Sequence, residues 1–364
     1  MYFDRFETRV GMVVVTGNEQ GLTHLFIDND TCTTAYNEDA EYAPQHFTEV
    51  KKQLNEFLCG TRQEFDLKLA PEGTEFQNRV WKALTEIPYG LSCSYKAIAE
   101  KVGNPKGSRA VGMANNKNPI PIIIPCHRVV GANGRLTGYA FGLAVKQQLL
   151  HLELINTVFE QLKQYYGRFS WWQAGSAYEV MVGAVLTQNT NWKNVEIALK
   201  NLEGRLSPEQ IECMPDTELG ELIRPSGFYN QKRLRLKALT RWFKQYGYDI
   251  KNVRNIDKDT LRAELLAISG IGPETADSIL VYAVGKPSFV IDAYTRRIFS
   301  RIGLEVPDHY ELFQQMIVRA LPENTEIFAY YHALLVEHAK RFCNTKPVCD
   351  GCPVQKQCVI GQKL

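Results

Sequence analysis

The chain has 364 residues, of which 45% are hydrophobic and 23% charged, and its formal net charge is +2. These values exclude a disordered or fibrous chain, and the length predicts two or three domains. The longest aliphatic stretch, residues 119–125, is too short to cross a bilayer, and the first ten residues contain no apolar core of a secretory signal. We therefore expect a cytoplasmic protein that makes no contact with membranes.

The cysteine count is odd, since there are nine, and four of them lie within residues 343–364. Such a pattern predicts thiols used for chemistry or metal binding in a reducing compartment rather than a disulfide framework.

Charge is distributed unevenly along the chain. Residues 1–68 carry a balance of −6, residues 69–153 of +5 and residues 154–364 of +3. Within the last part, residues 232–254 contain eight basic residues and one acidic residue. A basic run is usually a solvated helix face, but two separate basic zones favour contact with phosphate groups.

The first elements follow from hydrophobic periodicity. Alternation around Val10–Val15 and Leu22–Ile27, with glycines between, predicts a β-hairpin. Helical spacing follows over residues 47–58 and again over residues 76–87, where Pro88-Tyr89-Gly90 ends the pattern.

Two short helical patterns, residues 94–102 and 108–114, are separated by a glycine-containing turn. They are typical of a helix-turn-helix with Arg109 on its second helix. Two packed helices of any α domain fit the spacing about equally well.

A cysteine–histidine pair, Cys126-His127, follows an aliphatic run that is punctuated by prolines. A lone cysteine is more often a small buried hydrophobe than a catalyst. Here the run places the thiol in the interior, where it resists ionisation and needs a base. His127 can supply that base, directly or through water, if a carboxylate orients its ring, and Glu153 is the best candidate.

Residues 73–153 resemble the O6-alkylguanine-DNA alkyltransferases nearly position by position. The shared motifs are Gly73-Thr74-Glu75-Phe76-Gln77, Val80-Trp81, Ile87-Pro88-Tyr89-Gly90, Ser94-Tyr95, Arg109-Ala110-Val111-Gly112, Pro125-Cys126-His127-Arg128-Val129, Gly138-Tyr139, Gly142-Leu143, Lys146 and Glu153. The resemblance implies an α+β fold, with a small ribonuclease-H-like subdomain over residues 1–72 and a winged helix-turn-helix alkyltransferase domain over residues 73–153.

The same resemblance implies the chemistry of this half. Cys126 would take the alkyl group from O6-alkylguanine, with O4-alkylthymine as a further candidate, in one irreversible displacement. His127 would relay the proton through water, and Glu153 would hold the imidazole. The damaged nucleotide must leave the duplex, because its alkylated oxygen lies inside the stack. The implied contacts with DNA or the damaged base are Tyr95 at the adjacent phosphate, Arg109 in the gap, Asn118 at the active-site turn, Arg128, and Tyr139 in the base pocket.

Residues 154–364 predict an all-α domain that no linker separates from the first half. The expected helices are 154–166, 177–187, 193–201, 231–246, 259–267, 274–284, 293–301 and 310–320. Between two of them, the turn from Gly270 to Gly272 exposes amide groups that can cradle a DNA phosphate. Asp292 follows an aliphatic run, and on its own such a residue is more often a helix N-cap than a catalyst.

The C-terminal cysteines have the spacing C-x5-C-x2-C-x5-C. They are Cys343, Cys349, Cys352 and Cys358. Four thiolates can hold either zinc or a [4Fe–4S] cluster. Two C-x2-C pairs would favour zinc, and only the middle pair has that spacing here.

This cysteine loop, at the end of a helix-hairpin-helix chain, resembles that of the endonuclease III (HhH-GPD) superfamily of DNA glycosylases. The likeness covers residues 154–358 and includes residues 187–190 and 226–232. It implies a structural [4Fe–4S] cluster, with zinc as the less favoured alternative, and Asp292 as the catalytic carboxylate. Gln188 and Phe228 would enter the base stack as wedges.

Glu274 is a departure from the bifunctional members of that superfamily, which carry a lysine at this position. A carboxylate cannot form an imine, so strand cleavage by that route should be absent. A monofunctional glycosylase remains, in which Asp292 stabilises an oxocarbenium-like sugar and guides water. Trp171 and Trp172 could stack on a cationic base, or belong in part to the core. Together with Glu274 they resemble the 3-methyladenine glycosylase branch, although its best-known form lacks the cysteine loop.

The leading hypothesis is a monomeric DNA alkylation-repair protein that acts on duplex DNA and associates with the nucleoid when bound. Cys126 would accept alkyl groups in a single turnover, and the C-terminal half would excise N-alkylated purines such as 3-methyladenine without lyase activity. Two alternatives remain for the C-terminal half: excision of oxidised or mismatched bases, and a non-catalytic DNA-binding module.

Overall fold

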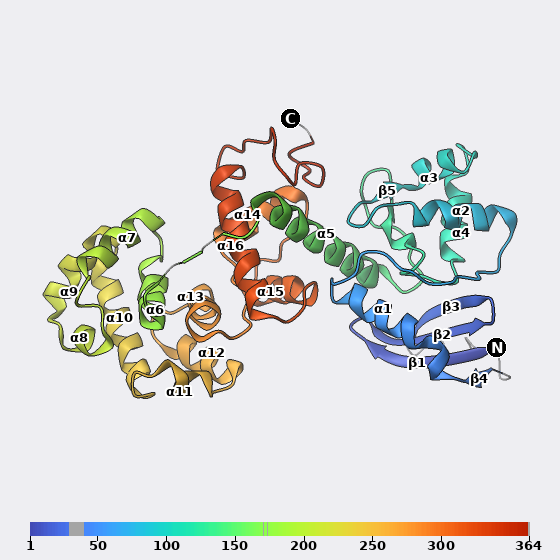
Figure 1. Cartoon of the computed structure of the whole chain (residues 1–364). Helices are drawn as coiled ribbons and strands as arrows, with labels where there is room; N and C mark the ends of the chain where they lie inside the picture. The colour runs from blue at the N-terminus through green and yellow to red at the C-terminus, as the bar shows by residue number, and fades with distance from the viewer. Residues whose placement is uncertain (29–39, 170, 173, 363–364) are drawn as a thin grey trace. The chain divides into compact units, whose positions relative to one another are not determined.

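The computed structural model describes residues 1–28, 40–169, 171–172 and 174–362 (Figure 1). Its contacts divide the chain into two compact units, each described by itself. Unit 1 comprises Met1–Gln161, Gln315–Pro322 and Pro353–Leu364, and unit 2 comprises Leu162–Gln314 and Glu323–Cys352. No helix in the described part of the chain is long and apolar enough to cross a membrane.

Unit 1 begins with a small sheet that one helix covers. The strands are β1 (Tyr2–Thr8), β2 (Gly11–Asn18), β3 (Gly21–Asp28) and β4 (Glu41–Tyr42), in the order β3-β2-β1-β4. The predicted hairpin is β2–β3, whereas β1 has no counterpart among the expected elements. A 3-10 turn, η1 (Pro44–Phe47), leads into α1 (Thr48–Leu58), which lies along the sheet (Figure 1). Val13, Leu25 and Phe57 are fully buried in this part of unit 1.

The second part of unit 1 contains short helices joined by a two-stranded sheet. Its elements are α2 (Glu75–Thr85), β5 (Cys93–Ser94), α3 (Tyr95–Lys101), α4 (Ser108–Asn116), the 3-10 turn η2 (Cys126–Arg128) and β6 (Val129–Val130). Helices α3 and α4 pack against each other, as the predicted helix-turn-helix requires. Trp81 of α2 anchors α4 by donating its indole N–H to Ala114 O at 2.9 Å. Because β5 pairs with β6, the start of α3 is held beside η2.

Helix α5 (Leu143–Tyr166) corrects the expected start of a helix at residue 154. Its buried positions Leu149, Leu152 and Ile155 continue one apolar face through residue 153, so nothing in the sequence interrupts the helix there. Glu153 therefore stands on a continuous helix, and its rigid backbone places the carboxylate.

Unit 2 is helical. Its elements are α6 (Ala177–Leu186), α7 (Trp192–Asn201), α8 (Pro208–Cys213), α9 (Asp216–Ile223), η3 (Arg224–Ser226), α10 (Tyr229–Lys244), α11 (Ile250–Arg254), α12 (Lys258–Ala267), α13 (Pro273–Ser278), the π-helical η4 (Ile279–Val284), α14 (Ala293–Ile302), α16 (Thr325–Arg341) and the first part of α15 (Tyr310–Arg319). Helices α8, α9, α11 and α16 were not among the expected elements. The first three are too short to show a period, and residues 331–336 of α16 are all buried, so no polar face marks the helix.

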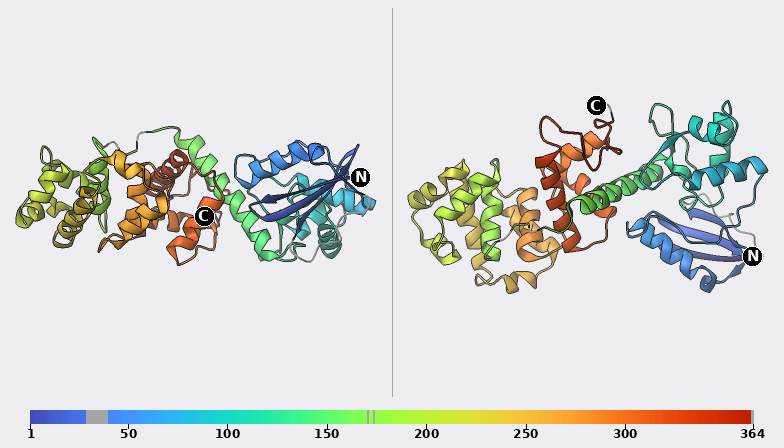
Figure 2. Two further views of the ribbon diagram at one scale, coloured as in Figure 1. Left: turned by 90° about the horizontal axis from the view of Figure 1, so that it is seen from below. Right: turned by 45° about the horizontal axis from the view of Figure 1, so that its top comes forward.

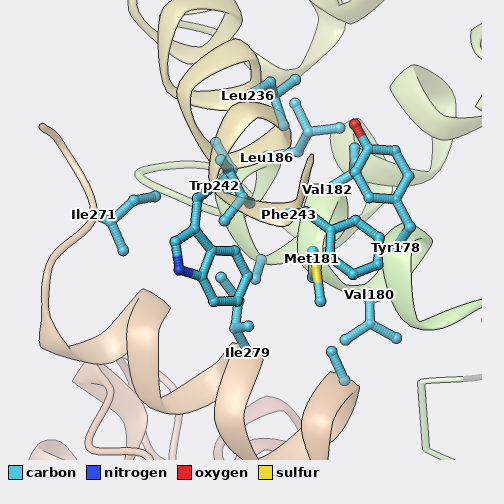
Figure 3. Close-up of a cluster of buried hydrophobic side chains, with 14 of the residues drawn as sticks. Tyr178, Val180, Met181, Val182, Leu186, Leu236, Trp242, Phe243, Ile271 and Ile279 are labelled. Carbon is cyan, nitrogen blue, oxygen red and sulfur yellow. The ribbon is translucent and has the colours of Figure 1, made fainter. Parts of the chain in front are cut away.

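The main core of unit 2 joins α6, α10 and the helices that follow. In Figure 3, Met181 and Val182 of α6 lie among Leu236, Trp242 and other side chains of this cluster. Inside it, the hydroxyl groups of Tyr178 and Thr240 are 2.6 Å apart, so this buried polar pair is satisfied. Figure 2 shows the helices of this cluster grouped together, and α14 and α16 pack against each other elsewhere in unit 2.

Candidate active sites

The thiol of Cys126 lies at the start of η2, inside a fully buried stretch of chain from residue 120 to residue 130. Cys126 is only 5% exposed. Burial raises the pKa of this thiol to about 11, against a smaller opposing effect of the hydrogen bond from Asn118. The thiol is therefore neutral at pH 7 and needs a base before it can attack an electrophile.

His127 and Glu153, the expected base and the acid that orients it, form a buried pair. His127 Nε2 is 2.7 Å from Glu153 Oε1, and both side chains are fully buried. A carboxylate only accepts, so Nε2 carries the hydrogen and Nδ1 keeps its lone pair. Nδ1 is buried and has no partner among the described protein groups. Burial lowers the pKa of His127 even though Glu153 acts in the opposite direction, so the ring is neutral and able to accept a proton.

Glu153 is held by more than His127. Arg128 Nε donates to both of its oxygens at 3.0 and 2.9 Å, and the amide of Gly90 donates to Oε2 at 2.9 Å. Burial alone would raise the pKa of Glu153, but His127 and Arg128 together lower it below the ordinary value. Arg128 was expected to contact DNA. In this structure Arg128 is buried, and its Nη1 donates to Ile87 O at 2.6 Å.

The motif that ends at Gly90 now has a physical explanation. Gly90 has φ +74, and a Cβ there would lie 2.0 Å from Thr157 Oγ1 on α5. Only glycine permits both the left-handed backbone and the close approach that brings its amide to Glu153.

Asn118 organises the loop that carries the thiol. Its amide nitrogen donates to Ile124 O at 2.8 Å and to Cys126 Sγ at 3.1 Å, and its Oδ1 accepts from the Ile120 amide at 3.1 Å. Within this loop the buried, β-branched Ile122 has φ +72. Such strain in a β-branched residue is unfavourable and typical of functional loops that their surroundings hold in place.

The other expected residues of this half lie around the loop in different settings. Tyr95 is the first residue of α3, and its hydroxyl donates to Thr137 O at 3.3 Å. Lys146 is fully buried and donates to Val129 O and Thr137 O at 2.6 and 2.8 Å. Arg109 is exposed on α4. Burial raises the pKa of Tyr139 well above its ordinary value, so this ring stays neutral.

A second candidate site in unit 2 is built on Asp292. It N-caps α14, with Oδ1 accepting from the Thr295 amide at 2.7 Å, so the N-cap interpretation is correct. Its other oxygen lies 3.5 Å from His332 Nε2 on α16. Burial would raise the pKa of Asp292, but the nearby His332 and hydrogen bonding by Thr295 lower it. Asp292 is therefore a carboxylate at pH 7, as a group that stabilises a cationic sugar must be.

Aromatic rings from three parts of unit 2 meet near this carboxylate; we call Trp171, Trp172, Tyr282 and His332 the aromatic cluster. The Tyr282 hydroxyl is 2.6 Å from His332 Nδ1. The Trp172 ring centroid is 5.3 Å from that of Tyr282, and Trp171 meets His332 edge-on at 6.5 Å. The sequence analysis missed His332 and Tyr282, since neither lies in a recognisable motif and His332 is forty residues beyond Asp292.

The hairpin turn and Gln188 form one hydrogen-bonded group. Gln188 Nε2 donates to Gly270 O at 3.0 Å and to Thr275 Oγ1 at 2.9 Å, and its Oε1 accepts from Arg235. Gly270 has φ +85, and a Cβ there would meet Arg235 at 2.2 Å, whereas Gly272 is open on that side. Gln188 must exchange these bonds before it can enter a base stack.

Glu274 follows the turn at the second position of α13 and is exposed. Partial desolvation and then the nearby charge of Asp292 raise its pKa. Phe228 has a left-handed backbone, φ +47, and its side chain remains 59% exposed. An exposed aromatic residue on a strained backbone is available for contact with a partner.

The basic run 232–254 is less available to phosphates than its charge indicates. Six of its eight basic residues donate to groups of unit 2 itself. They are Lys232, Arg233, Arg235, Lys237, Lys244 and Arg254. Most of these basic residues therefore also bind main-chain carbonyls or acidic side chains of unit 2, and phosphate contact by this run remains a prediction.

Of the C-terminal cysteines, Cys343, Cys349 and Cys352 are partly exposed and Cys358 is buried. The described residues include no group of three or more Cys, His, Asp or Glu side chains placed to hold a metal ion. Three of the sulfurs lie near nitrogen atoms: Cys343 with Arg301 Nη1 at 3.4 Å, Cys352 with His338 Nε2 at 3.8 Å, and Cys358 with the Gly361 amide at 3.3 Å. Four cysteine thiolates are donors of the kind that hold an iron–sulfur cluster or zinc.

Three family models match successive parts of the chain. Residues 1–71 match the ribonuclease-like domain of 6-O-methylguanine DNA methyltransferase, and residues 75–155 match its DNA binding domain. Residues 182–323 match the HhH-GPD superfamily base excision DNA repair protein.

Relatives support the same division. A methylated-DNA–protein-cysteine methyltransferase of Methanosarcina barkeri is 51% identical over 153 residues, which is 42% of this chain and 97% of that protein. A protein of Methanocaldococcus jannaschii named "Putative DNA repair glycosylase" is 48% identical over 212 residues, which is 57% of this chain and 96% of that protein.

Among solved structures, one titled "Structure of a non-covalent Endonuclease III-DNA Complex" is similar with a TM-score of 0.51 and 21% identity, covering 58% of this chain and 97% of that one. That likeness concerns the helical fold alone. The chain therefore belongs to the methylated-DNA–protein-cysteine methyltransferase family through its N-terminal part and to the HhH-GPD superfamily of base excision DNA repair proteins through its C-terminal part.

Proposed function

We propose that Cys126 accepts the alkyl group of O6-alkylguanine in DNA, and the observation that carries this is the enclosed series Cys126, His127 and Glu153. The sulfur attacks the alkyl carbon, a carbon–sulfur bond forms, and the bond from that carbon to guanine O6 breaks. The thiol proton passes to His127 Nδ1, and a proton returns to the departing guanine. No group near Cys126 can reverse a thioether, so each molecule acts once.

The surrounding residues have supporting roles in this proposal. Asn118 directs the thiol, and Arg128 holds Glu153 rather than DNA. Arg109, exposed on the second helix of the helix-turn-helix, fills the space that the rotated nucleotide leaves, and Tyr95 acts at the neighbouring phosphate. Tyr139 lines the base pocket. O4-alkylthymine is a further candidate substrate, because its alkyl group is also held on an exocyclic oxygen.

The test is mass spectrometry of the full chain after incubation with duplex DNA containing O6-methylguanine. We expect one methyl group on the peptide that contains Cys126, and none in Cys126→Ser. The matched control is Cys213→Ser, because Cys213 is a free, exposed thiol. Methylation of Cys213 instead of Cys126, or no gain in mass, would refute the proposal.

We infer that the C-terminal half is a monofunctional glycosylase for N-alkylated purines. Asp292 is ionised beside a developing positive charge, and the aromatic cluster offers ring faces for a cationic base, worth about 0.5–2 kcal/mol per ring. N-alkylated purines are cationic and leave readily, so a carboxylate without a nucleophilic lysine is sufficient. Glu274 at the lysine position supports base release without strand cleavage.

Assays on defined duplex lesions separate this proposal from its alternatives. Release of 3-methyladenine or 7-methylguanine with an intact strand is the expected result. Release of thymine glycol or of a mismatched thymine alone would assign oxidised or mismatched bases to this half. If Asp292→Asn left every activity unchanged, the half would be a DNA-binding module.

We also propose that Cys343, Cys349, Cys352 and Cys358 hold a [4Fe–4S] cluster that stabilises the C-terminal end of the chain. The cluster would supply structure and DNA positioning and no step of base release. Iron and sulfide analysis of protein purified without oxygen tests this, with Cys349→Ser as the variant and Cys213→Ser as the control. Stoichiometric zinc would overturn it.

A further inference from the structure

Two loops of unit 2 that carry the expected wedge residues are joined by one buried lysine. The first loop follows α6 and leads to Gln188, and the second precedes α10 and contains Phe228. Lys232 of α10 is fully buried, and its Nζ donates to Leu186 O at 2.8 Å and to Ser226 O at 2.7 Å. Each accepting carbonyl lies two residues before a wedge residue.

Burying this ammonium is unfavourable unless its donors are satisfied. Burial, with a smaller contribution from Arg235, lowers the pKa of Lys232 to about 8, which reflects that cost. A lysine kept in such a position contributes through the two bonds it makes. Without it, the carbonyls of Leu186 and Ser226 would be buried with one fewer donor.

The two loops differ in what else holds them. Gln188 is also bound to the hairpin turn through Gly270 and Thr275. The second loop has consecutive left-handed residues, Gly227 at φ +70 and Phe228 at φ +47, and the Phe228 ring is exposed. Lys232 therefore connects the strained loop of Phe228 to the loop of Gln188, which the Gly270 turn already holds.

We propose that Lys232 is a positioning residue that sets the spacing of Gln188 and Phe228 so that both enter the base stack at one lesion. The inference rests on the proposed glycosylase function. The positioning role of Lys232 should matter only on duplex DNA, because a single strand has no base stack for the wedge residues to enter. Lys232 touches neither the base nor the sugar.

The experiment compares Lys232→Met with Lys237→Met in the full chain. Methionine keeps the length of the side chain and removes its donors. Lys237 is the matched control, because it lies on the same helix and donates to the Glu212 and Met214 carbonyls, which belong to a segment without a wedge residue. The substrate is one strand methylated by dimethyl sulfate, used alone and annealed to its complement.

We expect Lys232→Met to slow base release from the duplex by about tenfold while release from the single strand stays within about twofold of the parent. Lys237→Met should change neither rate. Methyl transfer to Cys126 in the same preparation, and the melting temperature, report on folding. The fluorescence of a 2-aminopurine placed beside the lesion should rise less with Lys232→Met than with the parent, because the damaged nucleotide is extruded less often.

If Lys232→Met lowered the rate of base release equally on duplex and single-stranded DNA, the inference would be overturned, because Lys232 would then have a general structural role. Equal losses in both methionine variants would overturn it as well, as would an unchanged duplex rate. A parent protein that releases no base from either form would instead refute the glycosylase proposal itself. The two failures are therefore distinguishable.

Discussion

The two candidate sites hold their acidic groups differently, since Glu153 is fully buried and Asp292 is only partly buried. In unit 1, Glu153 is enclosed by His127, Arg128 and the Gly90 amide, and in the proposed mechanism it acts on the thiol only through the histidine. In unit 2, Asp292 has one oxygen on the α14 amide and the other near His332, beside rings that can accept a base. In the proposed functions, one kind of side chain therefore orients a base for a nucleophile in unit 1 and faces a developing cation in unit 2.

The contrast between the two sites would disappear if Asp292 served only as the N-cap of α14. We expect Asp292→Asn to lower base release by about 10²–10⁴-fold, because the amide cannot balance the charge on the sugar or guide water. DNA binding and methyl transfer to Cys126 should persist. Asp257→Asn is the control, since Asp257 N-caps α12 through the Thr260 amide at 2.9 Å and lies outside both sites. Similar losses in both variants would show a capping effect only.

The enclosed pair in unit 1 should be costly to break. Glu153→Gln leaves Arg128 buried without its ion pair, which we expect to destabilise the fold by about 3–5 kcal/mol. It should also slow methyl transfer, because the imidazole loses its orienting acceptor. Urea unfolding and single-turnover rates measure these effects. Glu86→Gln removes an exposed partner of Lys101 at 2.7 Å, and little change in the unfolding free energy is expected there.

The close approach at Gly90 offers a smaller test of how tightly Glu153 is enclosed. Gly90→Ala adds a left-handed backbone cost and a clash with Thr157, for which we expect about 2–3 kcal/mol of destabilisation. Gly134→Ala is the control, because Gly134 has φ +76 and nothing within 4 Å of a Cβ. The difference between the unfolding free energies of the two variants gives the cost of the clash with Thr157. Equal unfolding free energies would mean that α5 yields to the added methyl group.

The smallest expected effect is that of pH on stability. The folded-state pKa values of Glu153 and His127 are both lowered, so the folded protein binds fewer protons than the unfolded chain as the pH falls. The stability these groups contribute is complete above their unfolded values and is lost as acid protonates His127 and then Glu153. Melting temperatures between about pH 7.5 and 4.5 should therefore decline more in the parent protein than in His127→Gln, which removes the histidine and leaves Glu153 paired with Arg128. If the two plots of melting temperature against pH ran parallel, they would contradict the lowered pKa of His127.

Local patterns in the sequence were sufficient to predict many of the helices, strands and turns. The β2–β3 hairpin, helices α1 to α4, and the Gly270 turn were predicted because strand alternation, helical period and turn residues are properties of neighbouring positions. The buried His127–Glu153 pair beside Cys126 in the sequence was also predicted, since the surrounding motifs resemble a known family, and its catalytic role remains a prediction. The roles of Tyr95, Arg109, Tyr139, Gln188 and Phe228 remain predictions.

Tertiary structure alone decided the features that depend on distant residues. His332 approaches Asp292 from α16, a helix whose buried residues show no amphipathic period. Arg128 turns inward to Glu153, and most of the basic run 232–254 binds carbonyls or acids of its own unit. The physical reason is that charge and side-chain type are written in the sequence, whereas a hydrogen-bond partner is chosen only when packing removes water and brings distant segments together.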